Sequence, residues 1–203
     1  MKKVSRRSAL KSTLLGAGGF TAASAGGASA PTPPEIEGPF YPVTPQKDKD
    51  FDLTRIEGHT ETAKGTVVEI VGRVVDVDGN PIEDASVDLW QANDAGRYAH
   101  PRDSNPAPVD PHFQGWAVVP SGKDGGFRFK TIKPGVYPAS RKWDRPPHIH
   151  FKVTKFGYQA LTTQMYFPGE PLNTKDRLLQ RKSKAEQAMM IARPVKDKDG
   201  VFA

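Results

Sequence analysis

Short runs rich in Val, Ile and Phe, most of them bounded by Gly, Pro or Asp, recur between residues 66 and 167. Runs of this composition between turn residues are typical of β-strands. Short strands separated by turns favour a sandwich or a barrel. We therefore expect an all-β fold, an antiparallel β-sandwich with Greek-key-like connections. The expected strands are 66–77, 85–91, 116–119, 126–132, 149–154 and 162–167.

Helix is scarce in this pattern. The best candidate is the segment 173–188, where Asn173 or Thr174 could cap the first turn. We expect this short C-terminal helical segment to pack on one end of the sheet. After it, residues 197–200 predict one more turn, and a last strand begins near Val201.

The net charge of +6 is concentrated at the N-terminus. Residues 1–25 contain five of the 29 Lys and Arg residues and none of the 23 Asp and Glu residues. The rest of the chain is therefore nearly neutral, and it has no basic, aromatic stripe of the kind that follows phosphates. We expect no nucleic-acid partner. Because long apolar runs are also lacking, we expect no membrane span.

Residues 1–25 have the three parts of an export signal: a cationic start, an apolar middle and an Ala-rich end. The stretch Ser-Arg-Arg-Ser-Ala-Leu-Lys at 5–11 resembles the twin-arginine signal, which implies export of a folded protein. We expect cleavage after Ala25, with Ala30 as a second possible site. The alternative is a disordered basic tail. The sequence thus predicts an exported protein, periplasmic or extracellular.

The rest of the chain divides into an arm and a domain. Residues 26–60 are largely rich in Pro, Gly and charged residues, so we expect an extended arm. Only its Gly-Pro-Phe-Tyr-Pro segment at 38–42 is apolar enough to dock on a domain. Tyr41 in this element is expected to anchor the arm. Residues 61–203 contain all the expected strands and form the predicted sandwich domain.

The absence of Cys excludes thiol nucleophiles, disulfides and Cys-held metal sites. Any metal must be bound mainly by His, Asp, Glu or Tyr. His148 and His150 are two residues apart in an expected strand, so both imidazoles point to one face while Ile149 and Phe151 face the core. This spacing suits metal ligands. The alternative is that both are ordinary polar-face residues.

Two tyrosines are further candidates. Tyr98 follows an expected strand, and Tyr137 lies in a Lys-Pro-Gly-Val-Tyr-Pro segment. Both could lie at the rim of the same end of a sandwich. The alternative interpretation is two loop tyrosines with solvated hydroxyl groups.

Four segments together carry one family pattern: Asp-Leu-Trp-Gln-Ala-Asn at 88–93 leading into Gly-Arg-Tyr at 96–98, Phe-Gln-Gly-Trp at 113–116, Thr-Ile-Lys-Pro-Gly-Val-Tyr-Pro at 131–138, and Arg-Pro-Pro-His-Ile-His-Phe at 145–151. In this order they resemble the intradiol ring-cleavage dioxygenases, with a core like that of protocatechuate 3,4-dioxygenase. The resemblance spans residues 38–169. The fold of that family is an antiparallel β-sandwich, in agreement with the strand pattern.

The resemblance implies a ligand set for non-haem Fe(III), namely Tyr98, Tyr137, His148 and His150. Phenolates are hard anionic donors, and two of them with two neutral imidazoles suit iron(III). By the same resemblance, Tyr137 leaves the metal and helps to accept a substrate proton.

Two further residues are implied to act on the substrate. Arg145 would stabilise negative charge developing on the substrate ring. The alternative for Arg145 is a surface salt bridge to an acid such as Asp144. Gln164 would orient the substrate or a water, and its alternative is an outward polar residue on an alternating strand.

The activity implied is cleavage of a catechol-type ring between its two hydroxyl-bearing carbons. O2 is the second substrate, a muconate-type dicarboxylate is the product, and a homo-oligomer is expected. Ala139 stands where protocatechuate enzymes carry a bulky aromatic residue, which predicts a different substrate pocket. Two alternatives are a secreted, non-catalytic β-sandwich binding module and a metal-binding or aromatic-binding protein without turnover.

Other conspicuous side chains receive structural interpretations. We expect exposed imidazoles at His59, His100 and His112. Trp90 and Trp116 lie in strand patterns and are expected to form core or pocket wall.

Overall fold

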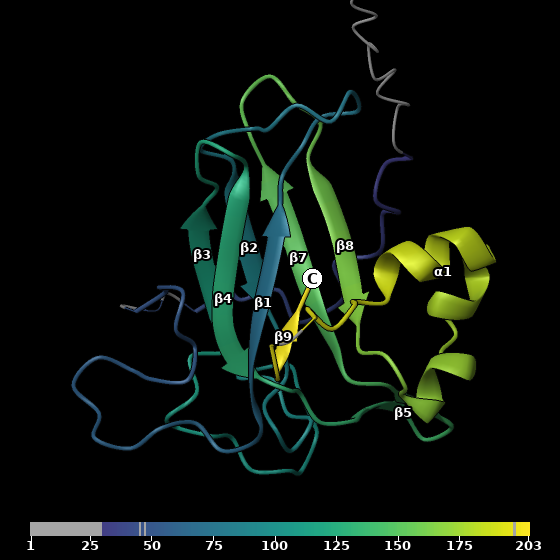
Figure 1. Cartoon of the computed structure of the whole chain (residues 1–203). Coiled ribbons are helices and arrows are strands. Elements are labelled where there is room, and N and C mark those ends of the chain that lie inside the picture. Colours follow the sequence, from purple (N-terminus) through teal and green to yellow (C-terminus); the bar gives the residue numbers. More distant parts are fainter. Residues whose placement is uncertain (1–29, 45, 47, 197) are drawn as a thin grey trace, which may run out of the picture.

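The computed structural model describes residues 30–44, 46, 48–196 and 198–203 (Figure 1). The export signal expected at residues 1–25 lies outside the described residues. No helix in the described part of the chain is both long and apolar enough to cross a membrane.

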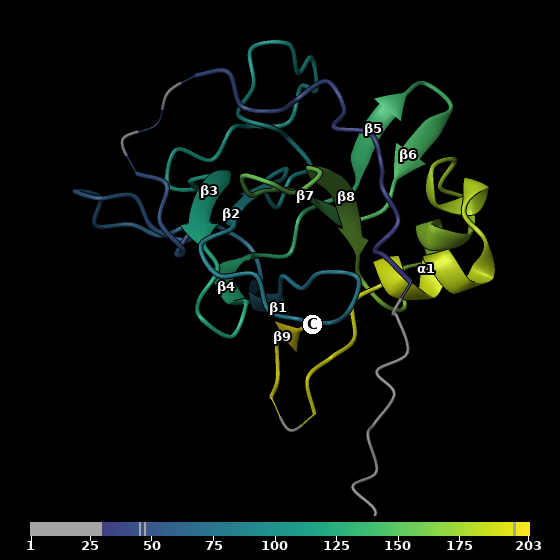
Figure 2. The same ribbon diagram turned by 90° about the horizontal axis from the view of Figure 1, so that it is seen from above.

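Two sheets face each other, and Figure 2 shows them as two layers. One sheet has the strand order β3-β2-β7-β8, the other has the order β4-β1-β9, and β5 and β6 form a separate hairpin. The strands are β1 (Val67–Arg73), β2 (Ser86–Trp90), β3 (Trp116–Pro120), β4 (Gly126–Ile132), β5 (Tyr137–Ser140), β6 (Trp143–Arg145), β7 (His148–Thr154), β8 (Leu161–Tyr166) and β9 (Val201–Phe202). The expected all-β sandwich is confirmed. All pairings between these strands are antiparallel except that of β9, which runs parallel to β1.

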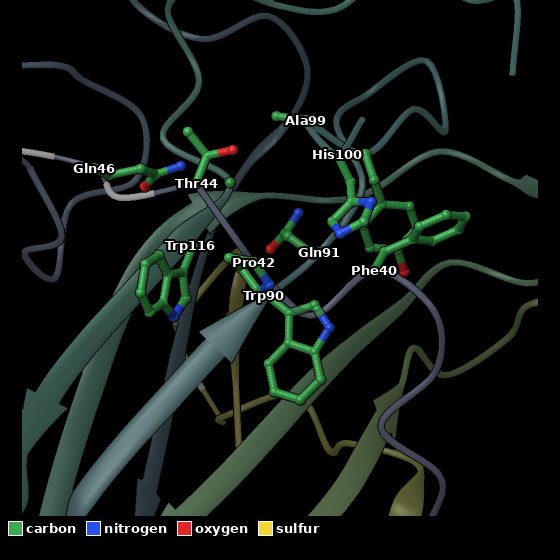
Figure 3. A pocket seen from close by; sticks show the side chains of 11 residues that line it. Phe40, Pro42, Thr44, Gln46, Trp90, Gln91, Ala99, His100 and Trp116 are labelled. Carbon is green, nitrogen blue, oxygen red and sulfur yellow. The ribbon is translucent and has the colours of Figure 1, made fainter. Parts of the chain in front are cut away.

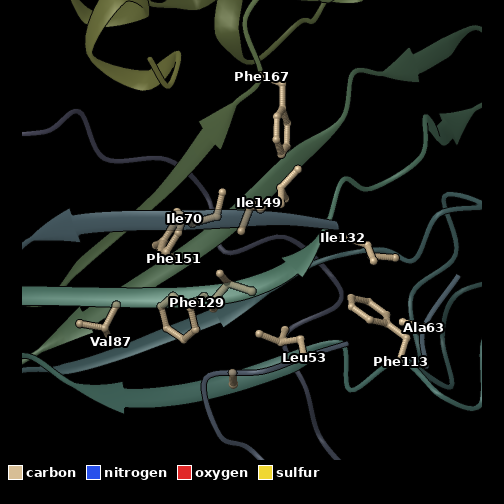
Figure 4. Packing of buried hydrophobic residues seen from close by; sticks show 13 residues of the cluster. Leu53, Ala63, Ile70, Val87, Phe113, Phe129, Ile132, Ile149, Phe151 and Phe167 are labelled. Atoms are coloured by element: carbon tan, nitrogen blue, oxygen red, sulfur yellow. The ribbon is translucent and has the colours of Figure 1, made fainter. Parts of the chain in front are cut away.

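The core lies between the two sheets (Figure 4). Alternate residues of each strand supply it, as the period of two in a strand requires. Val68 and Ile70 of β1 are buried in it, as is Leu89 of β2. Ile149 and Phe151 of β7 also belong to this core, as the sequence predicts. Their burial fixes the opposite orientation for the residues that alternate with them.

The C-terminal segment is helical but discontinuous. It contains the 3-10 turns η1 (Pro171–Thr174) and η2 (Leu179–Arg181) and the α-helix α1 (Lys184–Met190), beside β8 in Figure 1. The prediction of one helix over 173–188 is therefore wrong in its continuity. The Asp176 side chain accepts hydrogen bonds from the backbone N–H groups of Leu178 and Leu179, which starts a new turn there. Ser183 then begins α1 with a capping box.

The arm is extended and follows the sandwich closely. Its Glu35 N–H donates to the Thr162 carbonyl on β8, at 2.8 Å, and Thr163 Oγ1 donates to the Pro33 carbonyl. Farther along, the Leu53 N–H donates to the Lys130 carbonyl of β4, and the Leu53 side chain is fully buried in the core. The arm thus passes from an edge of one sheet to the other sheet.

Candidate active site

One row of side chains crosses the four-stranded sheet on the face away from the core. Trp90 of β2 is the cross-strand partner of His150 on β7, which is in turn the partner of Gln164 on β8. The next row pairs His148 with Tyr166. Because residues two apart share a face, these rows place both imidazoles beside each other.

Three donor atoms converge on this face. Tyr98 Oη lies 3.0 Å from His150 Nε2 and 3.3 Å from His148 Nε2. All three side chains are buried, with 3 to 4% of their surface exposed. Donor atoms that each lie about 2.0–2.2 Å from one metal ion are separated by about 3 Å, so this spacing fits a single ion.

Tyr137, the fourth residue of the predicted set, lies beside Tyr98. Its ring meets the Tyr98 ring edge to face, with centroids 5.5 Å apart. Tyr137 begins β5 and is paired with Arg145 on β6, so the hairpin brings Tyr137 beside Tyr98 and Arg145 beside His148. Within the described residues, no group of three or more His, Cys, Asp or Glu side chains is arranged to hold a metal. A metal at this site therefore depends on the tyrosines.

The hydrogen bonds of His148 fix its tautomer. Its Nδ1 lies 2.7 Å from the Pro146 carbonyl, which can only accept, so Nδ1 carries the proton. Its Nε2 lies 3.1 Å from Arg145 Nη1, which can only donate, so Nε2 presents a lone pair. A metal-binding imidazole needs this arrangement.

Both imidazoles are held neutral. Burial lowers the pKa of His148 well below its ordinary value, and the Arg145 charge lowers it further. Burial likewise lowers the pKa of His150, with contributions from His148 and Arg145. Neutral imidazoles are the form that binds metals.

The pKa values of the two phenols shift upward instead. Burial is the main cause that raises the pKa of Tyr98, and it also raises the pKa of the half-buried Tyr137. Each phenol therefore keeps its proton in the metal-free protein. Because a phenolate is the ligand form, metal binding at this site must release these protons.

Arg145 is buried beside the donors, with 5% of its surface exposed. Its Nε donates to Asp176 Oδ2 at 2.9 Å, and its Nη2 donates to Gln164 Oε1 at 2.8 Å. Burial lowers the pKa of Arg145, but the Asp176 hydrogen bond and nearby charges outweigh it and raise the pKa. The alternative of a surface salt bridge to Asp144 is wrong, because the partner is the buried Asp176.

Gln164 is also buried, with 1% of its surface exposed. Its Oε1 accepts from Arg145, and its Nε2 donates to the Ile36 carbonyl of the arm at 3.0 Å. The alternative of an outward polar residue is therefore wrong. Gln164 instead links the arm to the guanidinium group.

Sequence reasoning missed Tyr166 and Asp176. Tyr166 lies two residues after Gln164 on the same strand face, and its Oη accepts from Arg145 Nη2 at 2.8 Å. This period of two is a signal that could have found it. Asp176 lies in the segment interpreted as a continuous helix, and no local pattern connects it to Arg145.

Aromatic rings of the arm and of β2 enclose the donors. Phe40 packs against Tyr98 and Tyr137, with ring centroids 4.8 and 5.5 Å apart. Trp90 is stacked on His150, as pocket wall, in agreement with the sequence interpretation. Tyr41 anchors the arm as predicted, because its Oη donates to Asp88 Oδ2 at 2.7 Å.

A pocket of about 220 Å³ has Tyr98 among its lining residues. Figure 3 shows this pocket from close by. Trp90, Trp116, Phe40 and His100 line much of it. The expectation of an exposed His100 is wrong, since 6% of its surface is exposed and its ring packs on Phe40. Phe40 of the arm thus covers the loop that carries His100.

The other two histidines lie away from the donors. His59 is exposed as predicted. His112 is half-buried instead, and its Nε2 lies 2.7 Å from Glu61 Oε2. Neither contributes to the candidate site.

This chain is similar to known dioxygenases over most of its length. The family model Dioxygenase_C, described as a dioxygenase, matches residues 36–201. The protocatechuate 3,4-dioxygenase beta chain of Burkholderia cepacia is 40% identical over 160 residues, which cover 76% of this chain and 67% of that protein. The chlorocatechol 1,2-dioxygenase of Cupriavidus pinatubonensis is 33% identical over 161 residues, which cover 70% of this chain and 57% of that protein.

A solved dioxygenase structure is also similar, and the match covers a greater share of that protein. The dioxygenase domain of a dioxygenase carbohydrate-binding protein fusion from Streptomyces sp. SirexAA-E matches with a TM-score of 0.62 and 30% identity. The match covers 85% of this chain and 94% of that domain. The two sequence relatives are longer, and this chain spans 67% and 57% of their lengths.

Proposed function

This chain belongs to the intradiol ring-cleavage dioxygenase family, and we propose that it cleaves a catechol-type ring between the two hydroxyl-bearing carbons, using Fe(III) and O2. Both oxygen atoms enter the product, a muconate-type dicarboxylate. The observation that carries the proposal is the convergence of Tyr98 Oη with His148 Nε2 and His150 Nε2 beside the buried Arg145.

Tyr98, Tyr137, His148 and His150 would hold the ferric ion. The donor spacing, the unprotonated His148 Nε2 and the hard phenol oxygens all fit it. Bound iron(III) would withdraw electron density from a catecholate and make its ring reactive toward O2.

Tyr137 is the residue of this set best placed to move a proton. It is only half-buried, whereas Tyr98 has 3% of its surface exposed and is enclosed by Phe40. The Tyr137 phenolate oxygen would accept a proton from a catechol hydroxyl as the substrate binds. Tyr98 would stay in place.

Arg145 would stabilise the negative charge that develops on the substrate ring. Its Nη1 already points at the donor cluster, with His148 Nε2 3.1 Å away. A guanidinium held in place before the reaction stabilises such charge without reorganisation. Gln164, fixed between Arg145 and the Ile36 carbonyl, would orient the substrate or exclude water from this side.

Iron analysis and oxygen uptake test this function. About one iron per chain is expected, with a broad tyrosinate-to-iron band that shifts when catechol is added without O2. Addition of O2 should then consume one O2 per ring and yield the dicarboxylate. Tyr98→Phe and Tyr137→Phe should alter the visible band, whereas Tyr158→Phe, at an exposed position, should not.

Two outcomes would favour the alternatives. A colourless chain that does not take up iron would favour a non-catalytic binding module. A coloured chain that binds catechol but consumes no O2 would favour a metal-binding and aromatic-binding protein without turnover.

We also propose that the protein is exported through a twin-arginine-type signal at residues 1–25 and functions as a homo-oligomer. The motif at residues 5–11 supports export. Replacement of Arg6 and Arg7 by Lys should retain the protein inside the cell, and normal export of that variant would contradict the proposal. Analytical ultracentrifugation of the iron-loaded protein tests the assembly, and a single monomeric species would contradict it.

A further inference from the structure

Asp176 is a fully buried carboxylate in the turn between η1 and η2. Burial of a charge is costly unless it is paired and hydrogen-bonded. Asp176 meets this requirement: the backbone N–H groups of Leu178 and Leu179 donate to its Oδ1 at 3.1 and 2.9 Å, and Arg145 Nε donates to its Oδ2 at 2.9 Å. Its position is therefore fixed by the local backbone on one side and by Arg145 on the other.

The geometry of Arg145 depends on this contact. A guanidinium group is planar and rigid, so fixing two of its nitrogens also fixes the third. Asp176 engages Nε at 2.9 Å and Nη2 at 3.3 Å. The remaining nitrogen, Nη1, is turned toward His148 Nε2.

The other contacts of Arg145 are to neutral groups. Gln164 Oε1 and Tyr166 Oη each lie 2.8 Å from Nη2. Among the described residues, Asp176 is the only carboxylate in a salt bridge with Arg145. It alone both balances the buried positive charge and engages the Nε edge.

We propose that Asp176 is a positioning residue for ring cleavage, whose carboxylate holds the Arg145 guanidinium with Nη1 facing the metal donors. It sets turnover through Arg145 and does not touch the substrate. The inference rests on the proposed function, and it gives the C-terminal helical segment a role in placing this carboxylate.

Asp176→Asn is the first test. The amide Oδ1 can still accept from the Leu178 and Leu179 N–H groups, but an amide nitrogen opposite Arg145 Nε brings two donors together. With iron-loaded protein and catechol, we expect kcat to fall about 100-fold, as for loss of one preorganised charged donor, while iron content is unchanged. KM is expected to change by less than about threefold, because the contact acts on the transition state.

A direct readout does not depend on turnover. In ¹⁵N-labelled metal-free protein, the Arg145 Nε–H signal should be protected from solvent exchange, and Arg145→Lys assigns it by its loss. Asp176→Asn should shift this signal and abolish its protection. An unchanged signal would overturn the proposal.

Ser183→Ala is the matched control for simple destabilisation of the same segment. It removes the capping box of α1 and leaves the Arg145 contacts intact. We expect a lower melting temperature with kcat within about twofold of wild type. If Ser183→Ala reduces kcat as much as Asp176→Asn, the effect is structural and the proposal fails.

A double-mutant cycle separates action through Arg145 from any other route. If Asp176 acts through Arg145, adding Asp176→Asn to Arg145→Lys should lower kcat by less than about threefold further. A full additional loss would contradict the proposal. Should Asp176→Asn not fold, Tyr166→Phe tests the same network and should lower kcat about fivefold with iron retained.

These results are distinct from failure of the proposed function. If the wild-type chain cleaves no catechol, the proposed function fails. If the wild type is active and Asp176→Asn is equally active, only the positioning role fails.

Discussion

Trp90 lies flat against the imidazole of His150, with ring centroids 4.8 Å apart and planes inclined by 14°. The two residues are cross-strand partners on β2 and β7, so the sheet register itself creates the stack. The His150 Nδ1 has no hydrogen-bond partner among the described residues. Stacking on Trp90 therefore replaces the hydrogen bond that usually orients a metal-binding histidine.

Trp90→Leu should loosen this imidazole and weaken iron retention. The buried indole also contributes to stability, and its loss should lower the free energy of unfolding by about 3 kcal/mol. Chemical denaturation of the metal-free protein and the rate of iron loss to a chelator measure the two effects. Trp116→Leu is the control, because Trp116 lines the same pocket and has no ring contact with a histidine. Equal rates of iron loss in the two variants would contradict the role of the stack.

Tyr137→Phe should separate proton transfer from metal binding. Three ligands remain, so iron should still bind, but the group that accepts the substrate proton is lost. The expected fall in kcat is about 100-fold or more, the usual size for loss of a general base. Stopped-flow absorbance after mixing with catechol should show slower formation of the substrate complex. Formation at the wild-type rate would assign the proton to another group.

The sandwich and the histidine pair could be predicted because each rests on a local pattern, whereas the two tyrosines were implied by the family resemblance. The alternation around Ile149 places His148 and His150 on one face whatever the rest of the chain does. The surroundings of Arg145 depend instead on a contact between residues 31 positions apart, Arg145 and Asp176. No periodicity connects such positions, so Asp176 could not be predicted as the partner of Arg145, although the family resemblance implied that Arg145 acts on the substrate. His100 was misplaced for the same reason, because the arm that covers it is distant in sequence.

The arm should contribute to stability in a pH-dependent way through Asp52. Burial raises the pKa of its carboxyl, but hydrogen bonds from Thr54 and Lys130 outweigh burial and hold the pKa below its ordinary 3.8. A lowered pKa stabilises the folded state at pH values above the ordinary pKa of the group. This contribution disappears as the pH falls through the pKa of the folded state.

The difference in unfolding free energy between wild type and Asp52→Asn should therefore be largest near neutral pH and should disappear as the pH falls through the lowered pKa of Asp52 in the folded state. Urea denaturation at several pH values measures it. Asp144→Asn, at an exposed position, is the control for loss of a surface carboxylate and should change the free energy of unfolding little. A difference for Asp52→Asn that persists unchanged at low pH would show that the carboxylate charge is not its source.

Gly38 holds the arm over His150 in a conformation that other residues adopt with strain. Its φ is +78°, and a β-carbon there would lie 3.5 Å from His150 Cε1, an ordinary contact. The cost of Gly38→Ala is therefore in the backbone, about 1–2 kcal/mol. We expect the arm to shift and iron to be lost faster.

Gly58→Ala is the matched control, because Gly58 has φ of +82° and open space around it. Both variants should lose similar stability, and only Gly38→Ala should lose iron faster. Equal iron retention would show that the arm does not help to hold the metal.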